Sequence, residues 1–329
     1  MRSLALLDWF GLLPSHSSVV QSALTREDAD AAATAAKASA SSLVKADCTT
    51  DEWDGKSPNQ SSKAKLRISS QIHIIPGDKD EDKFERMKKW GIEGVELSGW
   101  HTNDPDYWKR VITDNGLTPS AVCWGSHDGD LCSDVVEKRQ KGVDDLKKAL
   151  EGAGKIGCTG VIYVPAFNGQ TKLTNQEIRK VLMDTFPALA EFAAECGTNI
   201  ILEPLNRGEA YFLRQVADGA AIARDVNGGK GIGVMGDFYH MSIEETDMMG
   251  AFISAGSYLK HVHLAGGTTD PRRTIPGQNK TRFVEGFRGL KYIGYDKFCS
   301  FECGVRGDKE VEIPKACEFL RREWELAVI

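Results

Sequence analysis

The sequence has no apolar run that approaches the roughly eighteen residues of a membrane-spanning helix. Residues 4–13 are apolar, but this stretch is short, is interrupted by Asp8 and has only Arg2 before it. A signal peptide combines a basic start with an uninterrupted apolar segment, so these residues match one poorly. We expect no membrane partner and a cytoplasmic location, with a secreted or periplasmic location as the alternative.

The cysteines lack the spacing of a metal or redox motif. The chain has eight, and none of them forms a C-x-x-C pair. A chain of 329 residues is also long enough to fold without disulfide staples. We therefore expect buried, reduced thiols.

The composition has no excess of basic residues. The chain has 41 Lys and Arg against 47 Asp and Glu, which gives a formal net charge of −6. Proteins that bind nucleic acid present a basic face to the phosphates, so nucleic acid is not the expected partner. The apolar content of 41% is ordinary for a globular protein and predicts a sizeable core.

Residues 1–66 differ in composition from the rest of the chain. Between positions 29 and 42 every residue is Ala, Ser, Asp, Thr or Lys, and the sequence that follows is polar. Such a segment cannot bury enough apolar surface to fold alone. We predict a poorly ordered N-terminal extension or linker over 1–66 and a folded domain over 67–329.

In residues 67–329, short apolar runs alternate with helical patterns. The predicted strands are 67–74, 92–97, 118–124, 159–164, 198–203, 230–237, 258–264 and 297–302. The helical patterns lie near 79–90, 105–115, 133–156, 174–195, 211–227, 243–255, 283–291 and 310–327. Eight strands in strict alternation with helices predict an α/β fold, a single (β/α)₈ TIM barrel, in preference to an open doubly wound sheet.

One glycine pattern imitates a dinucleotide-binding motif. Residues 231–236 have the sequence GIGVMG, which matches G-x-G-x-x-G by letters. The dinucleotide motif follows a strand and opens a helix, whereas this segment lies inside a predicted strand. We expect no dinucleotide site there.

Four residues with metal-ligand side chains close the last four predicted strands. They are Glu203, Asp237, His263 and Glu302. Barrel enzymes build their sites from side chains at the carboxyl ends of the strands, so we expect these four to meet. Three carboxylates and one imidazole form a hard ligand set that suits Mn²⁺, Mg²⁺ or Co²⁺. The alternative for each residue is a helix cap or a salt-bridge partner.

The strand order gives two of these carboxylates opposed positions. Strands five and eight lie three places apart around the ring, so Glu203 and Glu302 approach the centre from different sides. One could remove a proton next to a carbonyl group while the other returns a proton to the opposite face. A divalent cation would stabilise the enediolate as a Lewis acid. The arrangement predicts isomerisation or epimerisation of a ketose or keto-sugar.

Five motifs carry a resemblance to a known family. They are ILEPLNRGEAYFL, GDFYHM, HVHLAG, RTIPG and SFECG. In this order they resemble the sugar phosphate isomerase/epimerase group with the xylose isomerase-like TIM barrel, which includes tagatose/psicose 3-epimerases and hydroxypyruvate isomerases. The resemblance implies one divalent metal, with Mn²⁺ first and Mg²⁺, Co²⁺ or Zn²⁺ as alternatives. It also implies that the four residues are its ligands and that Glu203 and Glu302 are the catalytic pair.

The same resemblance implies substrate contacts at Glu209, His240 and Arg273. Glu209 could instead begin a helix as a favourable acid, and His240 could be an ordinary loop histidine. Arg272 is the alternative to Arg273 as the arginine that contacts the substrate. Glu96 ends the second predicted strand, where it could contact the sugar or serve as a structural carboxylate.

Other functions share this machinery. A lyase or hydratase acting on 3-keto-glycosides, including C-glycosides, would use the same proton abstraction followed by loss of a β-substituent. An endonuclease of abasic DNA shares the barrel, but the D-x-H expected after the seventh strand is missing here. A non-catalytic sugar-binding barrel is the remaining alternative. The expected partner is a small sugar, and the chain could also form a homo-oligomer.

Overall fold

The computed structural model describes residues 63–329, and most of the extension predicted over 1–66 lies outside these residues. The first strand begins at Arg67. In this part of the chain no helix is long and apolar enough to cross a membrane. The seven cysteines it contains are free thiols.

Eight parallel strands close into a barrel in chain order. They are β1 (Arg67–Gln71), β2 (Gly94–Ser98), β3 (Thr118–Gly125), β4 (Val161–Tyr163), β5 (Ile200–Leu202), β6 (Ile232–Asp237), β7 (Leu259–Leu264) and β8 (Phe298–Phe301). The strand β8 pairs back onto β1, which leaves no open sheet edge. The predicted (β/α)₈ barrel is confirmed, and each observed strand overlaps its predicted range.

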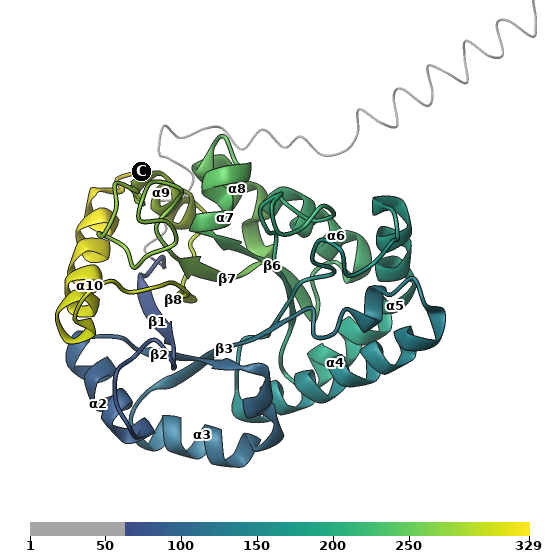
Figure 1. Cartoon of the computed structure of the whole chain (residues 1–329), viewed down its shortest axis with the longest axis horizontal. Helices are drawn as coiled ribbons and strands as arrows, with labels where there is room; N and C mark the ends of the chain where they lie inside the picture. Colours follow the sequence, from purple (N-terminus) through teal and green to yellow (C-terminus); the bar gives the residue numbers. More distant parts are fainter. Residues whose placement is uncertain (1–62) are drawn as a thin grey trace, which may run out of the picture. The chain divides into compact units, whose positions relative to one another are not determined.

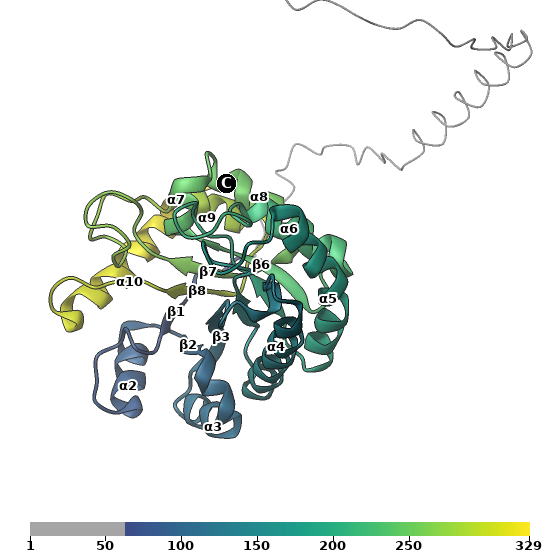
Figure 2. The same ribbon diagram turned by 45° about the vertical axis from the view of Figure 1, so that its right-hand side comes forward.

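Helices surround the strands in the order of the sequence (Figure 1). They are α2 (Asp80–Trp90), α3 (Pro105–Asp114), α4 (Val136–Ile156), α5 (Asn175–Glu195), α6 (Val216–Asn227), α7 (Phe238–Glu244), α8 (Met248–Ala255), α9 (Val284–Tyr292) and α10 (Lys309–Leu326). Short 3₁₀ turns lie at Gly99–Asn103, Asp130–Cys132 and Gly256–Tyr258. Turning the view by 45° shows the same succession, with α3 and α4 side by side (Figure 2).

The helix predicted near 243–255 is confirmed only in part, because α8 covers Met248–Ala255 and a separate helix, α7, ends at Glu244. Asp237 ends β6 and at once caps α7, where its Oδ1 accepts the amide hydrogen of Tyr239 at 2.7 Å. Asp247 then caps α8 by accepting the amide hydrogen of Gly250. Each carboxylate satisfies an amide that has no partner within its own helix. The Asp237 cap therefore starts α7 directly at the end of β6, and the Asp247 cap starts α8.

The interior of the barrel is divided between apolar and polar side chains. An apolar cluster comes from β3 to β6 and consists of Ala121, Ile162, Ile201 and Met235. The neighbouring strands β7 and β8 instead contribute His261, His263 and Ser300, all fully buried. The main apolar core lies between the strands and the helices. Burying polar groups costs free energy unless they are paired, so the polar half of the interior needs an explanation in terms of its contacts.

Gly231 lies in the false dinucleotide motif, and the backbone requires a glycine there. Its φ is +70°, and a Cβ would overlap the carbonyl oxygen of Ala190 in α5. The remaining motif residues lie in β6, as expected. Gly228 also has a positive φ, +57°, but a Cβ there would meet nothing within 4 Å.

Comparing alanine variants of Gly231 and Gly228 separates the cost of a backbone clash from the cost of a positive φ alone. We expect Gly228→Ala to cost about 1 kcal/mol of unfolding free energy, because only the left-handed conformation is penalised. Gly231→Ala should cost roughly 3 kcal/mol or more, because the backbone of α5 must also move away from β6. Urea unfolding of both variants measures the difference. Equal losses would contradict the close approach of β6 and α5.

Candidate metal centre and active site

The four predicted ligands converge at one end of the barrel. Asp237 and His263 lie in β6 and β7, while Glu203 and Glu302 directly follow β5 and β8. One ligand atom from each of the four lies within 4.8 Å of the others. Because the strands are parallel, this is the carboxyl end of the barrel, where barrel enzymes place their sites.

His263 lies at the centre of this cluster, and its two ring nitrogens face different partners. Nδ1 lies 2.9 Å from Glu302 Oε2, 3.6 Å from Glu203 Oε1 and 3.9 Å from Asp237 Oδ2. Nε2 lies on the other side, 3.1 Å and 3.2 Å from the two carboxylate oxygens of Glu96. Among the described residues, Nδ1 is a buried atom with no hydrogen-bond partner.

This geometry fits a divalent cation. When Nε2 donates its hydrogen to Glu96, the neutral ring presents the Nδ1 lone pair to three carboxylates. A lone pair that faces anions is unfavourable unless a cation lies between them. The approach of Glu302 at 2.9 Å lacks hydrogen-bond geometry, so it does not relieve this arrangement. One imidazole and three carboxylates could hold a hard divalent metal ion.

Asp237 has two functions in this structure. Its Oδ1 caps α7, which is the helix-cap role expected as the alternative to a metal ligand. Its Oδ2 remains turned toward His263 and Arg273. The side chain is fully buried. One carboxylate can therefore fix the start of a helix and still offer an oxygen to the cluster.

The close packing of the cluster shifts the pKa of each neighbour in a direction set by burial and charge. Burial raises the pKa of Glu203, and the nearby charge of Glu302 adds to this. Burial acts in the same direction on Glu302, but the charge of His263 outweighs it and lowers the pKa of Glu302 to about 2. Burial opposes the charged form of His263, yet Glu302 and Glu96 raise its pKa well above the usual range. A proton and a metal ion therefore compete for the same ring nitrogen.

Arg273 brings a positive charge into the cluster. Its Nη2 donates to Asp237 Oδ2 at 3.0 Å and also to Glu302 Oε2. Its guanidinium lies over the ring of Tyr239, 4.8 Å from the centroid. Burial opposes the charge of this guanidinium, but Asp237 and Glu302 raise its pKa. The neighbouring Arg272 is exposed, so the structure places Arg273, and not Arg272, at the cluster.

His240 is buried beside Arg273, and Asn206 holds its ring. Nδ1 accepts the backbone amide hydrogen of Asn206 at 3.2 Å and lies 2.8 Å from the side-chain nitrogen of the same residue. On the other side of the ring, Nε2 lies 2.9 Å from Arg273 Nη1 and 3.6 Å from Asp237 Oδ2. Asn206 and Arg273 therefore hold the histidine from both sides, at the edge of the cluster.

Glu209 lies at the edge of this group. Its Oε1 accepts from the Asn206 side chain at 2.7 Å and lies 3.9 Å from His240 Nδ1. Its side chain is 43% exposed, so it can reach a bound molecule. The loop that carries Glu209 is anchored by Glu244, which accepts from the backbone and the guanidinium of Arg207.

Glu96 does not lie on the surface of the mouth. It is fully buried and contacts His261, His263 and Gln71. Burial alone would raise its pKa, but the charge of His263 and the hydrogen bonds from both histidines lower it. This placement favours the structural-carboxylate alternative over a sugar contact. His261 is a polar partner of the same carboxylate.

Sequence reasoning missed Asn206, Gln71 and the polar contacts of His261. Asn206 stands inside the ILEPLNRGEAYFL motif, so that motif marked the position without revealing its contact with His240. Gln71 is the last residue of β1, and its position at a strand end was the only available signal.

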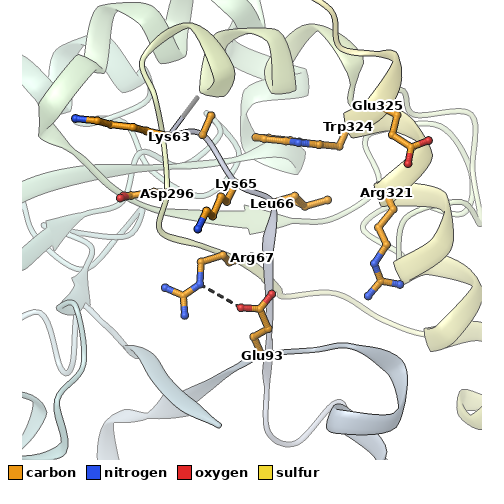
Figure 3. Close-up of a pocket in the computed structure, with 10 residues that line it drawn as sticks. Lys63, Lys65, Leu66, Arg67, Glu93, Asp296, Arg321, Trp324 and Glu325 are labelled. Atoms are coloured by element: carbon orange, nitrogen blue, oxygen red, sulfur yellow. Dashed lines mark hydrogen bonds and ion pairs between the residues drawn. The ribbon is translucent and has the colours of Figure 1, made fainter. Parts of the chain in front are cut away.

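A large cavity lies away from this cluster. It has a volume of about 980 Å³ and opens where β1 begins, beside Arg67, Glu93 and Asp296 (Figure 3). Glu93 immediately precedes β2, and Asp296 lies two residues before β8, so the cavity lies at the amino ends of the strands. Its lining includes both cations and anions, and Arg67 already pairs with Glu93 at 3.3 Å. The convergent polar groups at the carboxyl end are therefore a better candidate site than this cavity.

Comparison with known proteins agrees with this geometry. Residues 84–323 match the sequence profile of the xylose isomerase-like TIM barrel family. The chain belongs to this family. It is 30% identical over 252 residues to 3-dehydro-D-guloside 4-epimerase of Escherichia coli K12, covering 74% of this chain and 94% of that protein. It is 28% identical over 223 residues to D-psicose 3-epimerase of Agrobacterium fabrum, covering 64% of this chain and 75% of that protein.

A solved structure supports the same assignment within the xylose isomerase-like family. The apo form of 3-keto-D-glucoside 4-epimerase from E. coli superimposes with a TM-score of 0.70 at 27% identity, covering 78% of this chain and 100% of that structure. The chain is therefore an enzyme with isomerase or epimerase activity. The predicted family, fold and enzyme class are confirmed.

Proposed function

We propose that this enzyme is a divalent-metal-dependent epimerase that inverts the carbon next to the carbonyl group of a keto-sugar. The observation that carries the proposal is the position of Glu203 and Glu302. They come from strands three places apart, and both lie within 4.8 Å of the ligand atoms of Asp237 and His263. Two carboxylates that face one point from different strands suit proton removal on one face and proton return on the other.

In this mechanism each side chain of the site has its own role. Glu203 or Glu302 takes the proton next to the carbonyl, and the other carboxylate delivers a proton to the opposite face. A divalent cation bound by the four ligands supplies a Lewis acid for the negative charge that develops on the substrate oxygens. Arg273 donates to a substrate oxygen, His240 lies beside the same oxygen, and Glu209 accepts from a hydroxyl group. Mn²⁺ is the metal that we propose, from the oxygen-rich ligand set.

The relatives suggest which carbon is inverted. One is a 4-epimerase of a 3-keto sugar, and another is a 3-epimerase of psicose, whose carbonyl is at C2. In both cases the inverted carbon is the neighbour of the carbonyl, where the hydrogen is acidic. We propose 3-keto-glycosides as the first substrate class for this enzyme, because that relative aligns over 94% of its own length. Free ketoses are the second class.

A lyase remains a second candidate, and the 3-keto-glycoside relative favours keeping it. Removal of a proton next to the carbonyl can be followed by return of a proton or by loss of a β-substituent. The first outcome is epimerisation and the second is cleavage of the glycoside. Nothing in the four ligands separates these outcomes, so the products must be analysed.

A cytoplasmic location remains part of this proposal and rests on the weak signal-peptide character of residues 4–13. A small sugar is the proposed partner, and a homo-oligomer stays a prediction. Nucleic acid and membranes remain unexpected as partners.

The test is proton exchange in D₂O. Protein reconstituted with Mn²⁺ is incubated with 3-keto-glycosides, ketohexoses and ketopentoses, and the products are examined by NMR and mass spectrometry. We expect deuterium at the carbon next to the carbonyl in both epimers of at least one substrate. A released aglycone would indicate the lyase. Absence of exchange with every substrate, from protein shown to carry metal, would overturn the proposal.

A further inference from the structure

Below the metal cluster, the barrel interior contains a layer of three polar side chains. This polar layer consists of Gln71 from β1, Glu96 from β2 and His261 from β7. Glu96 and His261 are fully buried, and Gln71 is 7% exposed. On the opposite side of the interior, apolar side chains are found instead: Ala121, Ile162, Ile201 and Met235. A buried carboxylate among these strands is costly unless its contacts serve a purpose.

Glu96 accepts hydrogen bonds from three donors. Oε2 lies 2.7 Å from His261 Nε2, and Oε1 accepts from Gln71 Nε2 at 2.9 Å. His263 Nε2 lies between the two oxygens, at 3.1 Å and 3.2 Å. A carboxylate offers only acceptors, so it can satisfy all three donors at once. An amide or hydroxyl in its place would bring a donor against at least one of them.

Gln71 connects this layer to a second metal ligand. Its Nε2 donates to Glu96 Oε1 at 2.9 Å and to Glu302 Oε1 at 3.1 Å. Glu302 keeps its other oxygen, Oε2, toward His263 Nδ1. One amide nitrogen therefore bridges Glu96 and a ligand of the cluster. Two of the four ligands, His263 and Glu302, are held from below by the same carboxylate and its neighbour.

We propose that Gln71, Glu96 and His261 are positioning residues that prepare His263 and Glu302 for the metal. Glu96 accepts the Nε2 hydrogen of His263, which leaves the lone pair on Nδ1 and directs it toward Glu203, Asp237 and Glu302. His261 fixes the second oxygen of Glu96, and Gln71 fixes the rotamer of Glu302. This inference rests on the proposed metal site and deepens it. Partners of this kind orient ligands and typically change metal affinity when they are removed.

The same residues could be taken for a second metal site, since Glu96, His261 and His263 also cluster. The contacts favour hydrogen bonds. The separations of 2.7 to 3.2 Å are hydrogen-bond lengths, and every nitrogen that faces Glu96 has a hydrogen to give. All three residues are fully buried, whereas the side chain of Glu302 gives the four-ligand cluster an edge that is 20% exposed. We therefore expect one metal ion per chain.

The test is direct Mn²⁺ binding to the Glu96→Gln variant, measured by calorimetry and by electron paramagnetic resonance of the free ion. We expect affinity to fall about 10- to 100-fold. Imidazole ¹⁵N spectra of protein loaded with diamagnetic Mg²⁺ should show His263 with its hydrogen on Nε2 in the parent and loss of that form in the variant. A purely structural role would change stability without changing either quantity.

Glu323→Gln is the matched control. Glu323 is also a buried carboxylate, 3% exposed, and it accepts hydrogen bonds from Arg282 and Phe283 instead of from the cluster. It should lose stability and keep Mn²⁺ affinity.

A second variant covers a Glu96→Gln protein that fails to fold. Gln71→Leu keeps all charges and should weaken Mn²⁺ binding several-fold, because it releases Glu302 and removes one of the hydrogen bonds to Glu96. Unchanged affinity in every soluble variant would overturn the inference and leave the proposed function standing. Binding of two ions by the parent would also overturn it. If the parent bound no Mn²⁺, the proposed function itself would fail.

Discussion

Replacing Glu302 with Gln is expected to lower kcat for epimerisation by about 10²- to 10⁴-fold, and Glu203→Gln should do the same. Each amide keeps the shape of the side chain and removes its ability to accept a proton. Inversion needs both carboxylates, because one takes the proton and the other replaces it on the opposite face. Either single variant should therefore stop the complete reaction.

Proton exchange without inversion distinguishes these two variants. The remaining carboxylate can still remove the proton that lies on its own side and return deuterium to the same face. With the two separated epimers as substrates, each variant should label one epimer and not the other, and the two variants should show opposite preferences. Labelling of both epimers by either variant would contradict the two-base assignment.

Metal binding and substrate binding provide the controls for this comparison. Both glutamates are also proposed ligands, so Mn²⁺ content is measured for each variant and exchange is compared at saturating metal. Glu209→Gln alters a contact outside the pair, since Glu209 approaches Asn206 and His240. It should raise KM and keep labelling in both epimers.

The fold was predictable from the sequence because its periodicity is local. The segment before Asp237 forms a strand in register with β7, with Met235 opposite His261 and Asp237 opposite His263. That register is what places the predicted ligands side by side. Helix α7 was missed because the cap on Asp237 makes a strand-end residue begin a helix. Hydrophobic patterning does not detect such a cap.

The support beneath the site was not predictable from a single sequence. Gln71 and Glu302 are 231 positions apart, and Glu96 and His261 are 165 apart. Neither pair is joined by local spacing, and only closure of the barrel brings them together. The four ligands could be found because each closes a strand, whereas Asn206 acts through its backbone and side chain on a histidine from another loop. Position along a strand predicts convergence, but it does not predict which side chains then pair.

Removing the metal is expected to abolish turnover and to destabilise the fold together. Three carboxylates face His263 Nδ1 within 2.9 to 3.9 Å, and Arg273, which pairs with two of them, leaves part of their repulsion uncompensated without the metal. A Lewis acid that contributes several kcal/mol to the transition state accounts for roughly 10³-fold or more in rate. Binding to the folded state alone also stabilises it, by roughly 3 kcal/mol at a free metal concentration about 100 times Kd.

The measurement is dialysis against a chelator, followed by exchange assays, thermal unfolding and stepwise addition of Mn²⁺. Activity and Tm should recover along the same titration curve, because one binding event restores both. Asp237→Asn sharpens this test: Asn still caps α7 through its side-chain oxygen, so the helix is retained while a charged ligand is lost. It should need more Mn²⁺ for activity than the parent. Full activity in protein shown by elemental analysis to lack metal would show that the carboxylates act without a metal ion. Arg273 and His240 would then have to stabilise the enediolate alone.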